Sequence, residues 1–190
     1  FYWVDDGPRA PPPGFDPACA GAGLGDYYCY SRYNATTVAH WCASRRDDGS
    51  CPEITPAEIA EFQTQIGSCM ARAAAANLSV AINVRVDDGA GLGGWRNTLD
   101  FDPTRRYGRY SYEEAFLAPL ADAAAKASRP GARLAFVPQG EMGASVFFFP
   151  TEWVGVLSRL RARLARGGAR PEVGFAINSE RLLELIALYL

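Results

Sequence analysis

Hydrophobic residues at helical spacing predict four helices along the chain. The residues expected to cap these helices are Thr55, Ser111, Thr151 and Ser179. Two of the starts are capping boxes, because Glu58 and Glu114 follow the cap by three residues. These two helices are expected to run to about Ala76 and Ser128. Pro119 should kink the second of them, because proline lacks a backbone donor and clashes with the preceding turn.

Strand-like segments alternate with the predicted helices. They lie at 1–4, 80–86, 133–137 and 173–177. Strands that alternate with helices favour right-handed crossover connections and a parallel sheet. Residues 8–54 would then form a long insertion, rich in Cys, Gly and Pro, after the first strand of a single domain that spans 1–190. Two architectures fit this order: an open doubly wound sheet and part of a (β/α)8 barrel.

The alternation of side chains within the strands favours the barrel. One face of segment 80–86 is bulky, and the other carries Asn83 and Arg85. A sheet covered by helices on both faces would bury these polar groups, whereas a barrel interior accepts them near its open end. The polar residues at strand ends in phase with this inner face are Asp87, Gln139, Glu141 and Asn178. We therefore predict an α/β fold of the (β/α)8 TIM-barrel type, in which strands two to five are present.

Composition narrows the classes of function. The 190 residues include 19 basic and 21 acidic ones, so the formal charge is −2 and we expect no basic face for nucleic acid. No apolar run approaches the ~20 residues of a membrane span. His40 is the only histidine and no C-x-x-C spacing occurs, so we expect no metal site. The glycine-rich run 89–94 matches neither a phosphate-binding loop nor a dinucleotide fingerprint, so we expect no cofactor.

Cysteines and glycosylation sequons together favour the secretory pathway or the extracellular space. Four cysteines crowd into the insertion: Cys19, Cys29, Cys42 and Cys51. Two disulfides among them are expected, and three pairings remain open. Cys69 occupies an apolar helical position and is expected to be a buried free thiol. The sequons begin at Asn34 and Asn77, and the start at Phe1 without a Met leads us to expect further sequence upstream.

Glu141 is the first candidate for chemistry. It follows Gly140 just past the segment 133–137 and precedes a loop. A carboxylic acid that neighbouring aromatic side chains remove from water can stay protonated and act as a general acid. The alternative is a loop carboxylate that accepts a hydrogen bond from a backbone amide.

Residues near the strand ends are candidates for substrate contact. Asp87 is in phase with the predicted barrel interior and could bind a hydroxyl group, whereas its neighbour Asp88 is expected to form a turn. Trp95 could stack on a sugar ring, or its side chain could fold back and pack against its own loop. The other residues expected to contact substrate are Arg96, Gln139 and Asn178. The last of these could also begin the turn into the following helix.

Taken in order, these motifs resemble the TIM-barrel retaining glycoside hydrolases, and especially the β-mannanase-like members. The segments that carry the resemblance are Val84-Arg-Val-Asp-Asp-Gly, Gly94-Trp-Arg-Asn-Thr-Leu-Asp-Phe, Tyr112 to Leu120, Gln139-Gly-Glu-Met, Trp153 with Leu157 and Arg161, and Ala176-Ile-Asn. The resemblance covers about 55–178. It implies that Glu141 is the acid/base and that the loop with Trp95 contacts substrate. The chain departs from the family pattern in having Gly-Glu where Asn-Glu is common.

The resemblance also implies a second carboxylate, the nucleophile, at the end of a seventh strand. If 1–4 is strand two, that position lies beyond Leu190. Glu180 falls in the first turn of a helix, where the helix dipole favours an acidic residue, and it is not taken as the nucleophile.

Two functions therefore remain open. One is a glycoside hydrolase that acts on an oligosaccharide or polysaccharide, and the other is a non-catalytic or truncated carbohydrate-binding relic of the same barrel. A partial barrel is also expected to self-associate through its open sheet edges.

Overall fold

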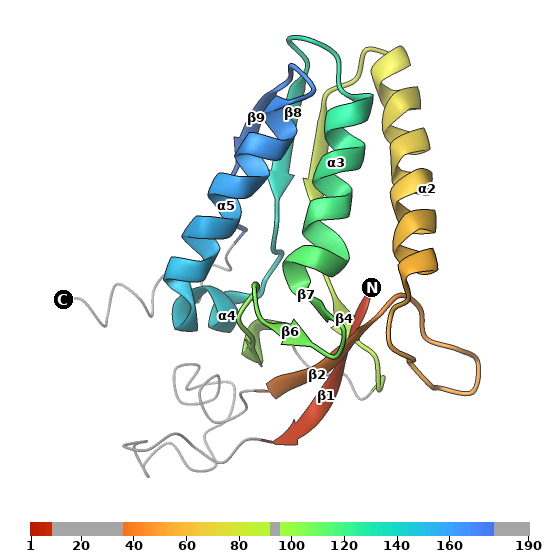
Figure 1. The fold of residues 1–190 in the computed structure, drawn as a ribbon, viewed down its shortest axis with the longest axis vertical. Coiled ribbons are helices and arrows are strands. Elements are labelled where there is room, and N and C mark those ends of the chain that lie inside the picture. The colour runs from red at the N-terminus through yellow and green to blue at the C-terminus, as the bar shows by residue number, and fades with distance from the viewer. Residues whose placement is uncertain (9–35, 92–95, 177–190) are drawn as a thin grey trace, which may run out of the picture.

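A three-stranded parallel sheet forms the centre of the computed structural model, which describes residues 1–8, 36–91 and 96–176 (Figure 1). The strands follow the order β3-β8-β9, and their bounds are Val80–Asn83, Arg133–Val137 and Arg170–Val173. Three long helices connect or precede these strands: α2 (Pro56–Ala75), α3 (Ala118–Ala127) and α5 (Pro150–Ala165). The chain is therefore a mixed α/β fold.

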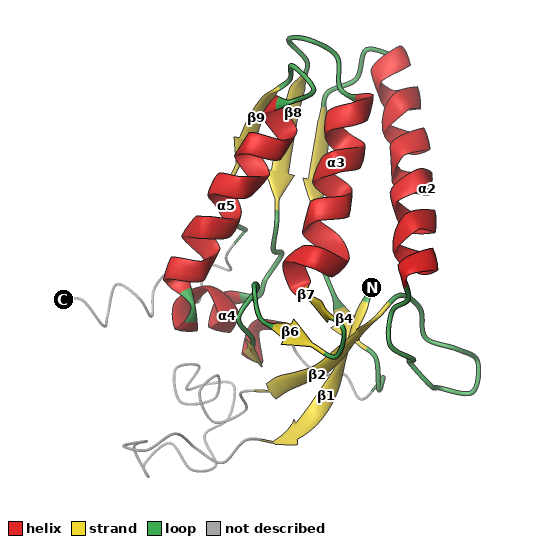
Figure 2. Ribbon diagram, viewed as in Figure 1, coloured by secondary structure: helices red, strands yellow, loops and turns green. Residues whose placement is uncertain are grey.

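The three long helices all lie on one face of the parallel sheet, as Figure 2 shows. Leu134 and Phe136 of β8 point to this face and are buried in the same core as Leu160 of α5. On the other face, Ala81 and Asn83 of β3 are exposed. The predicted separation into a bulky face and a small or polar face is confirmed for these strands.

A second sheet of four strands lies beside the carboxyl ends of the parallel strands (Figure 1). Its order is β4-β1-β2-β5, with bounds Asp87–Asp88, Tyr2–Pro8, Thr36–Cys42 and Leu99–Asp100. β1 and β2 are antiparallel, whereas β4 runs parallel to β1 and β5 parallel to β2. A short antiparallel pair follows, formed by β6 (Arg106–Tyr107) and β7 (Tyr110–Ser111).

The placement of the first strand corrects the sequence-based prediction. Segment 1–4 was expected in the same parallel sheet as 80–86, but β1 pairs with β4, which follows that segment, and not with β3. Backbone hydrogen bonds hold this register: the Asp87 N–H donates to the Phe1 carbonyl (2.9 Å) and the Gly89 N–H donates to the Trp3 carbonyl (2.8 Å). The antiparallel partner β2 comes from within 8–54, so β1 belongs to a sheet that strand periodicity alone did not predict.

Both capping boxes form as predicted. At α2, the Glu58 N–H donates to Thr55 Oγ1 (3.3 Å) and the Thr55 N–H donates to Glu58 Oε2 (2.8 Å). At the second box, the Glu114 N–H donates to Ser111 Oγ (3.1 Å). The Glu114 carboxylate also accepts hydrogen bonds from Arg106, and these hold the pKa of Glu114 below its ordinary value.

The second predicted helix is divided in two. A π-helical turn, η3 (Glu113–Leu117), comes first, and α3 with Pro119 near its start follows. Pro119 has no backbone N–H to donate to the preceding turn, so a regular α-helix would lack one hydrogen bond there. The helix changes from π-helical to α-helical geometry at this point.

Three other features of the helices and strands differ from the prediction. An additional short helix, α4 (Gly143–Phe148), precedes α5, and α5 begins at Pro150 rather than with a cap at Thr151. Strand β9 begins at Arg170 because it pairs with β8 from Arg133 onward, so it lies before most of the predicted segment 173–177. The helix predicted after Ser179 lies outside the described residues.

The cysteines follow the prediction only in part. A disulfide joins Cys42 at the end of β2 to Cys51, which confirms one bridge in the cysteine-rich insertion. Cys19 and Cys29 lie outside the described residues. Cys69 is free but exposed, not buried, because it neighbours Met70 on α2 without sharing the buried face of that helix.

A cluster of aromatic side chains packs the four-stranded sheet against α5. Trp41 of β2 contacts Phe101 and Tyr112 with ring centroids 5.2 Å apart in each case. Phe101 and Tyr112 in turn contact Trp153 of α5, at 6.3 and 6.0 Å. All four are fully buried, and burial raises the pKa of Tyr112 well above its ordinary value. The Tyr112 hydroxyl donates to the Pro138 carbonyl at 3.0 Å.

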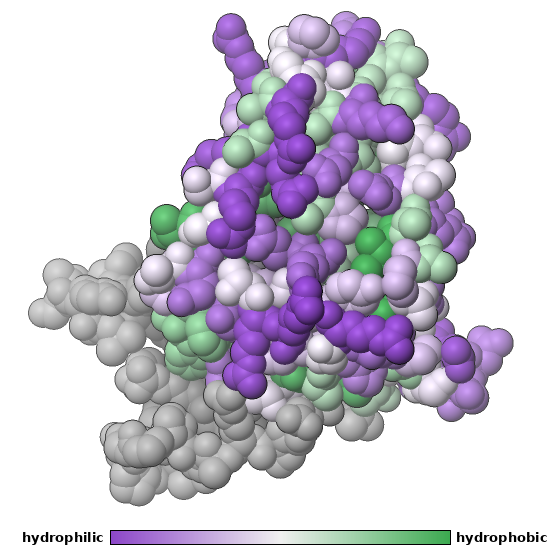
Figure 3. Space-filling model, in the orientation of Figure 1, coloured by the Kyte–Doolittle hydropathy of each residue, from purple (hydrophilic) through white to green (hydrophobic). Residues whose placement is uncertain are grey.

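The outward face of the helices is mostly hydrophilic (Figure 3). Arginines on α5 contribute to this face through ion pairs: Arg159 binds Glu113 at 2.6 Å, and Arg163 binds Asp122 at 2.8 Å. Among the described helices, none combines the length and the apolar character that crossing a bilayer requires.

Removal of the disulfide tests how much this bridge contributes to the free energy of unfolding. Cys42 and Cys51 are separated by 9 positions, and closing a loop of that size in the unfolded chain is worth about 2–3 kcal/mol. We expect the double variant Cys42→Ala/Cys51→Ala to lose about that much free energy of unfolding in urea titrations. The matched control is Cys69→Ala at the exposed free thiol, expected within about 0.5 kcal/mol of the parent. Equal stability of the double variant and the control would contradict this expectation.

A buried hydroxyl in the aromatic core provides a second test. Ser145 Oγ donates to the Phe101 carbonyl (2.6 Å) and accepts from Trp153 Nε1 (2.9 Å). Ser145→Ala leaves both buried groups without this partner, at a cost of about 1–3 kcal/mol. Urea unfolding should show this loss, whereas Ser158→Ala, at an exposed position of α5, should change the free energy of unfolding by less than about 0.5 kcal/mol. A neutral Ser145→Ala would mean that the bridge contributes nothing.

Candidate functional site

Charged residues gather where β3 and β8 end. Arg85 and Asp87 follow β3, Glu141 follows β8, and Arg96 begins the short helix η2 (Arg96–Thr98). We call these four residues the Arg96 cluster. The cluster lies at the carboxyl edge of the parallel sheet, where ligands bind in both open and barrel-shaped parallel folds.

Arg96 is the centre of this cluster. Its three donor nitrogens have three different acceptors: Nε donates to the Val86 carbonyl (3.0 Å), Nη1 to Glu141 Oε2 (2.8 Å) and Nη2 to Asp87 Oδ1. One guanidinium group therefore bridges two carboxylates and the backbone. Arg96 is 22% exposed and Glu141 32%, so the ion pair that joins them is partly shielded from water.

A second guanidinium group approaches the same carboxylate. Arg85 Nη2 lies 3.8 Å from Glu141 Oε1, and its side chain is half exposed. Arg85 reaches this position because Gly140 has no side chain: a Cβ on Gly140 would lie 2.7 Å from Arg85 Cγ and 2.6 Å from Asn83 Oδ1. The glycine before Glu141 thus allows β3 and β8 to approach closely at the site.

Glu141 has a backbone conformation that glutamate rarely adopts. Its φ is +63°, in the left-handed region. For a residue with a Cβ this conformation costs roughly 1–2 kcal/mol. Such strain persists only where surrounding contacts impose it, and it is concentrated at functional sites.

Four hydrogen bonds impose this conformation. The backbone N–H groups of the segment 140–143 donate in order to Val84 O (2.8 Å), Ala176 O (3.1 Å), Gln139 Oε1 (2.8 Å) and Asn97 Oδ1 (3.0 Å). The acceptors come from the segments that follow β3, β8 and β9, and from η2. Each backbone N–H group of the segment 140–143 is therefore hydrogen-bonded, and three of the four acceptors lie on other parts of the fold.

The predicted site residues separate into three groups. Asp87 and Glu141 meet through Arg96 in one ion-pair network; the strand-end argument predicts the approach of the two carboxylates but not the position of Arg96 between them. Gln139 is fully buried beneath the loop, where it supports Met142 through Oε1, and its Nε2 has no hydrogen-bond partner among the described residues. Trp95 and Asn178 lie outside the described residues.

Two contributors were not predicted as site residues. Arg85 was recognised only as a polar residue on the inner face, although its phase with Asp87 placed it at the site. Asn97 is fully buried and anchors Gly143, a contact across 46 positions of sequence. In the sequence Asn97 was only a possible hydrogen-bond donor beside Arg96, and no local pattern predicted that its side chain would accept from the Gly143 N–H.

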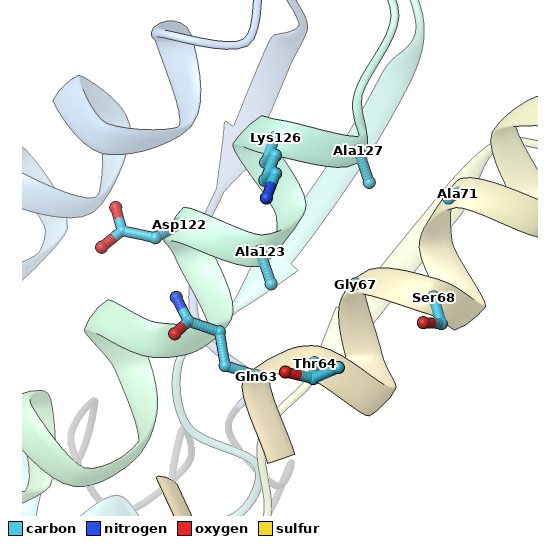
Figure 4. A pocket seen from close by; sticks show the side chains of 9 residues that line it. All are labelled: Gln63, Thr64, Gly67, Ser68, Ala71, Asp122, Ala123, Lys126 and Ala127. Atoms are coloured by element: carbon cyan, nitrogen blue, oxygen red, sulfur yellow. The ribbon is translucent and has the colours of Figure 1, made fainter. Parts of the chain in front are cut away.

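The described part of the chain also has a groove remote from the Arg96 cluster. It lies between α2 and α3, has a volume of about 550 Å³, and is shown in Figure 4. Small residues and polar or charged side chains from the two helices line it: Gln63, Thr64, Gly67, Ser68, Ala71, Asp122, Ala123, Lys126 and Ala127. It contains none of the predicted site residues.

Comparisons with known proteins add no assignment: no family model, no curated protein and no solved structure matches the chain.

Within the described residues, no group of three or more His, Cys, Asp or Glu side chains is placed to hold a metal ion. His40, the only histidine, lies near the disulfide, where its Nε2 is 2.9 Å from the Cys51 carbonyl oxygen. Among the described residues, the Arg96 cluster is therefore the strongest candidate for a functional site.

The strain at Glu141 can be measured separately from its charge. Glu141→Gly and Glu141→Ala both remove the carboxylate, but only Ala keeps a Cβ at φ +63°. We expect the Gly variant to be more stable than the Ala variant by about 1 kcal/mol, measured by urea unfolding.

The control for this comparison is Ala60, an exposed position within α2. There the order should reverse, because glycine in a helix interior is about 1 kcal/mol less favourable than alanine. If Ala is as stable as Gly at position 141, the left-handed conformation stores no energy and the argument from strain fails.

Proposed function

We propose that this chain is a glycoside hydrolase-like domain of the partial (β/α)8 type, with Glu141 as its general acid/base. The observation that carries the proposal is the strained backbone of Glu141 at the carboxyl edge of a parallel sheet. A stabilising role alone would not need a glutamate in a conformation that glycine adopts without cost. The family resemblance of the segment 139–142 supports the same residue.

The roles of the neighbouring residues follow from their contacts. Arg96 orients the Glu141 carboxyl group, because one of its nitrogens binds that group while another is anchored on the Val86 carbonyl. Asp87 is 61% exposed and accepts from the same guanidinium, so it is available to bind a sugar hydroxyl. Trp95 and Asn178 keep the substrate-binding roles that the sequence suggests, whereas Gln139 is buried and instead holds the backbone of Met142.

The chemistry requires Glu141 to pass a proton to the glycosidic oxygen as the bond to the sugar breaks. A sugar that enters the site must therefore take over part of the contact that Arg96 makes with Glu141. Retaining hydrolysis also needs a second carboxyl group about 5–5.5 Å from the first. The resemblance assigns that group to a later strand, so Asp87 is proposed as a substrate contact and not as the nucleophile.

The alternative is a non-catalytic carbohydrate-binding domain. The observation that favours it is the approach of two guanidinium groups, Arg96 and Arg85, to the Glu141 carboxylate. In this reading the ion pairs are permanent, and the exposed acceptors and donors at the sheet edge bind sugar hydroxyls without breaking a bond.

The proposed location is extracellular or within the secretory pathway. The disulfide between Cys42 and Cys51 supports it, because disulfides form and persist in oxidising compartments. Among the described strands, β3 and β9 are the edges of the parallel sheet, and they are proposed to allow self-association, since an unpaired strand edge is a template for another chain.

Substitution of Glu141 tests the catalytic proposal. The full-length protein, with the later strand to which the resemblance assigns the nucleophile, is assayed for release of reducing ends from β-mannan and from other β-linked glycans. Glu141→Gln keeps the size of the side chain and removes the acid, so we expect turnover to fall by a factor of ~100 or more with the fold retained by circular dichroism. Asp88→Asn, which alters a neighbouring turn carboxylate, should have a much smaller effect.

Three outcomes decide between the readings. Activity that survives Glu141→Gln on a substrate with a poor leaving group contradicts the acid/base assignment. Glycan binding in affinity electrophoresis without any release of reducing ends favours the binding domain. A chain that neither binds nor cleaves any glycan of the panel contradicts both.

A further inference from the structure

The turn between α2 and β3 carries a sequon that the candidate site does not use. Its residues are Asn77, Leu78 and Ser79, and all three are exposed. Leu78 is 60% exposed, which makes it one of the few large apolar side chains that the described surface leaves open to water. A sequon on an exposed turn satisfies the first requirement for an attached glycan, which is room for a bulky group.

The conformation of the turn keeps the acceptor side chain outside the helix. Asn77 follows the end of α2 with a φ of +59°, a left-handed conformation that asparagine tolerates better than most residues. Its backbone N–H donates to the Ala74 carbonyl (3.1 Å), and the N–H of Leu78 donates to the Ala73 carbonyl (3.0 Å). The backbone of the turn is therefore closed by the helix end, and the Asn77 side chain is not needed as a cap.

The contacts of the carboxamide distinguish its two ends. Arg129, from the turn before β8, donates through Nη2 to Asn77 Oδ1 at 3.0 Å. Within the described part of the chain, no hydrogen bond engages Nδ2. The oxygen is thus held by the protein, while the nitrogen is the atom that remains for another partner.

We propose that Asn77 is an N-glycosylation site. In the reaction, Nδ2 forms a bond to the anomeric carbon of an oligosaccharide carried on a lipid pyrophosphate, and the bond from that carbon to the pyrophosphate oxygen breaks. The lipid pyrophosphate leaves with the electron pair, and the amide nitrogen loses one proton. The product keeps Oδ1, so the contact with Arg129 can persist after modification.

The position of the turn is compatible with the function of the rest of the molecule. Asn77 precedes the amino end of β3, whereas the Arg96 cluster follows the carboxyl end of the same strand (Figure 1). A glycan on Asn77 would therefore lie at the end of the sheet remote from the cluster. There it would cover Leu78, which together with Met70 and Val80 lines a small hollow.

The experiment uses the full chain directed into the secretory pathway of a eukaryotic host. Asn34→Gln removes the other sequon, so any glycan on this background reports on Asn77 alone. The protein is recovered from both the lumen of the secretory pathway and the culture medium. It is treated with peptide N-glycanase and then digested to peptides. Conversion of Asn77 to Asp in the peptide mass spectrum, with a mobility shift of the intact chain on treatment, is the expected result.

Matched variants separate the sugar from the conformation of the turn. Ser79→Ala on the same background leaves Asn77 and its contact with Arg129 in place and should abolish the mobility shift completely. Ser79→Thr keeps the sequon and should restore the shift. If Asn77 is recovered unmodified from the Asn34→Gln chain, or if Ser79→Ala leaves the shift unchanged, the proposal is wrong.

Discussion

The shared burial of four aromatic rings is the constraint on which the rest of this structure depends. Trp41, Phe101, Tyr112 and Trp153 come from four separate parts of the chain, and each ring lies within contact distance of at least two others. Aromatic side chains bury more apolar surface than any other type, so this cluster contributes a large share of the hydrophobic stabilisation. It also packs β2 of the four-stranded sheet against α5, which lies on a face of the parallel sheet.

The polar groups inside this cluster give it a defined geometry. Burial of apolar rings is non-directional, but Ser145 hydrogen-bonds both the Phe101 carbonyl and the Trp153 indole, and the Tyr112 hydroxyl binds the Pro138 carbonyl. A buried donor or acceptor without a partner is costly, which restricts how the rings can pack. Within the described residues, Trp41 Nε1 of this cluster has no such partner. Ser145 lies in α4, directly after the Glu141 loop, so the packing of the core also positions the candidate site.

The Glu141 loop combines strain with support. A left-handed glutamate is unfavourable alone, yet the four backbone N–H groups of 140–143 are all hydrogen-bonded and two side chains, Gln139 and Asn97, are buried to supply acceptors. The carboxylate is then held by Arg96, which is itself anchored on the backbone. A loop built in this way keeps one orientation of its carboxyl group, which the proposed proton transfer and the proposed sugar recognition would both require.

Local sequence patterns determined the elements of this protein whose physical cause is local. The capping boxes at Thr55 and Ser111, the strand Arg133–Val137 and the division of β3 and β8 into two faces depend on neighbours three or four positions away, or on simple alternation. The meeting of Asp87 with Glu141 was also predictable, because parallel strands end at the same edge of a sheet.

Only the tertiary structure decided the features that depend on partners distant in sequence. Whether segment 1–4 pairs with 80–86 or with the residues beyond it is a choice of register, and the antiparallel partner β2 and the backbone of Asp87–Gly89 settle it. The left-handed turn at Glu141 and the support from Asn97 likewise have no local signature, because their hydrogen-bond acceptors lie on other elements. Periodicity reports which side of an element is apolar, but it does not report which element will cover that side.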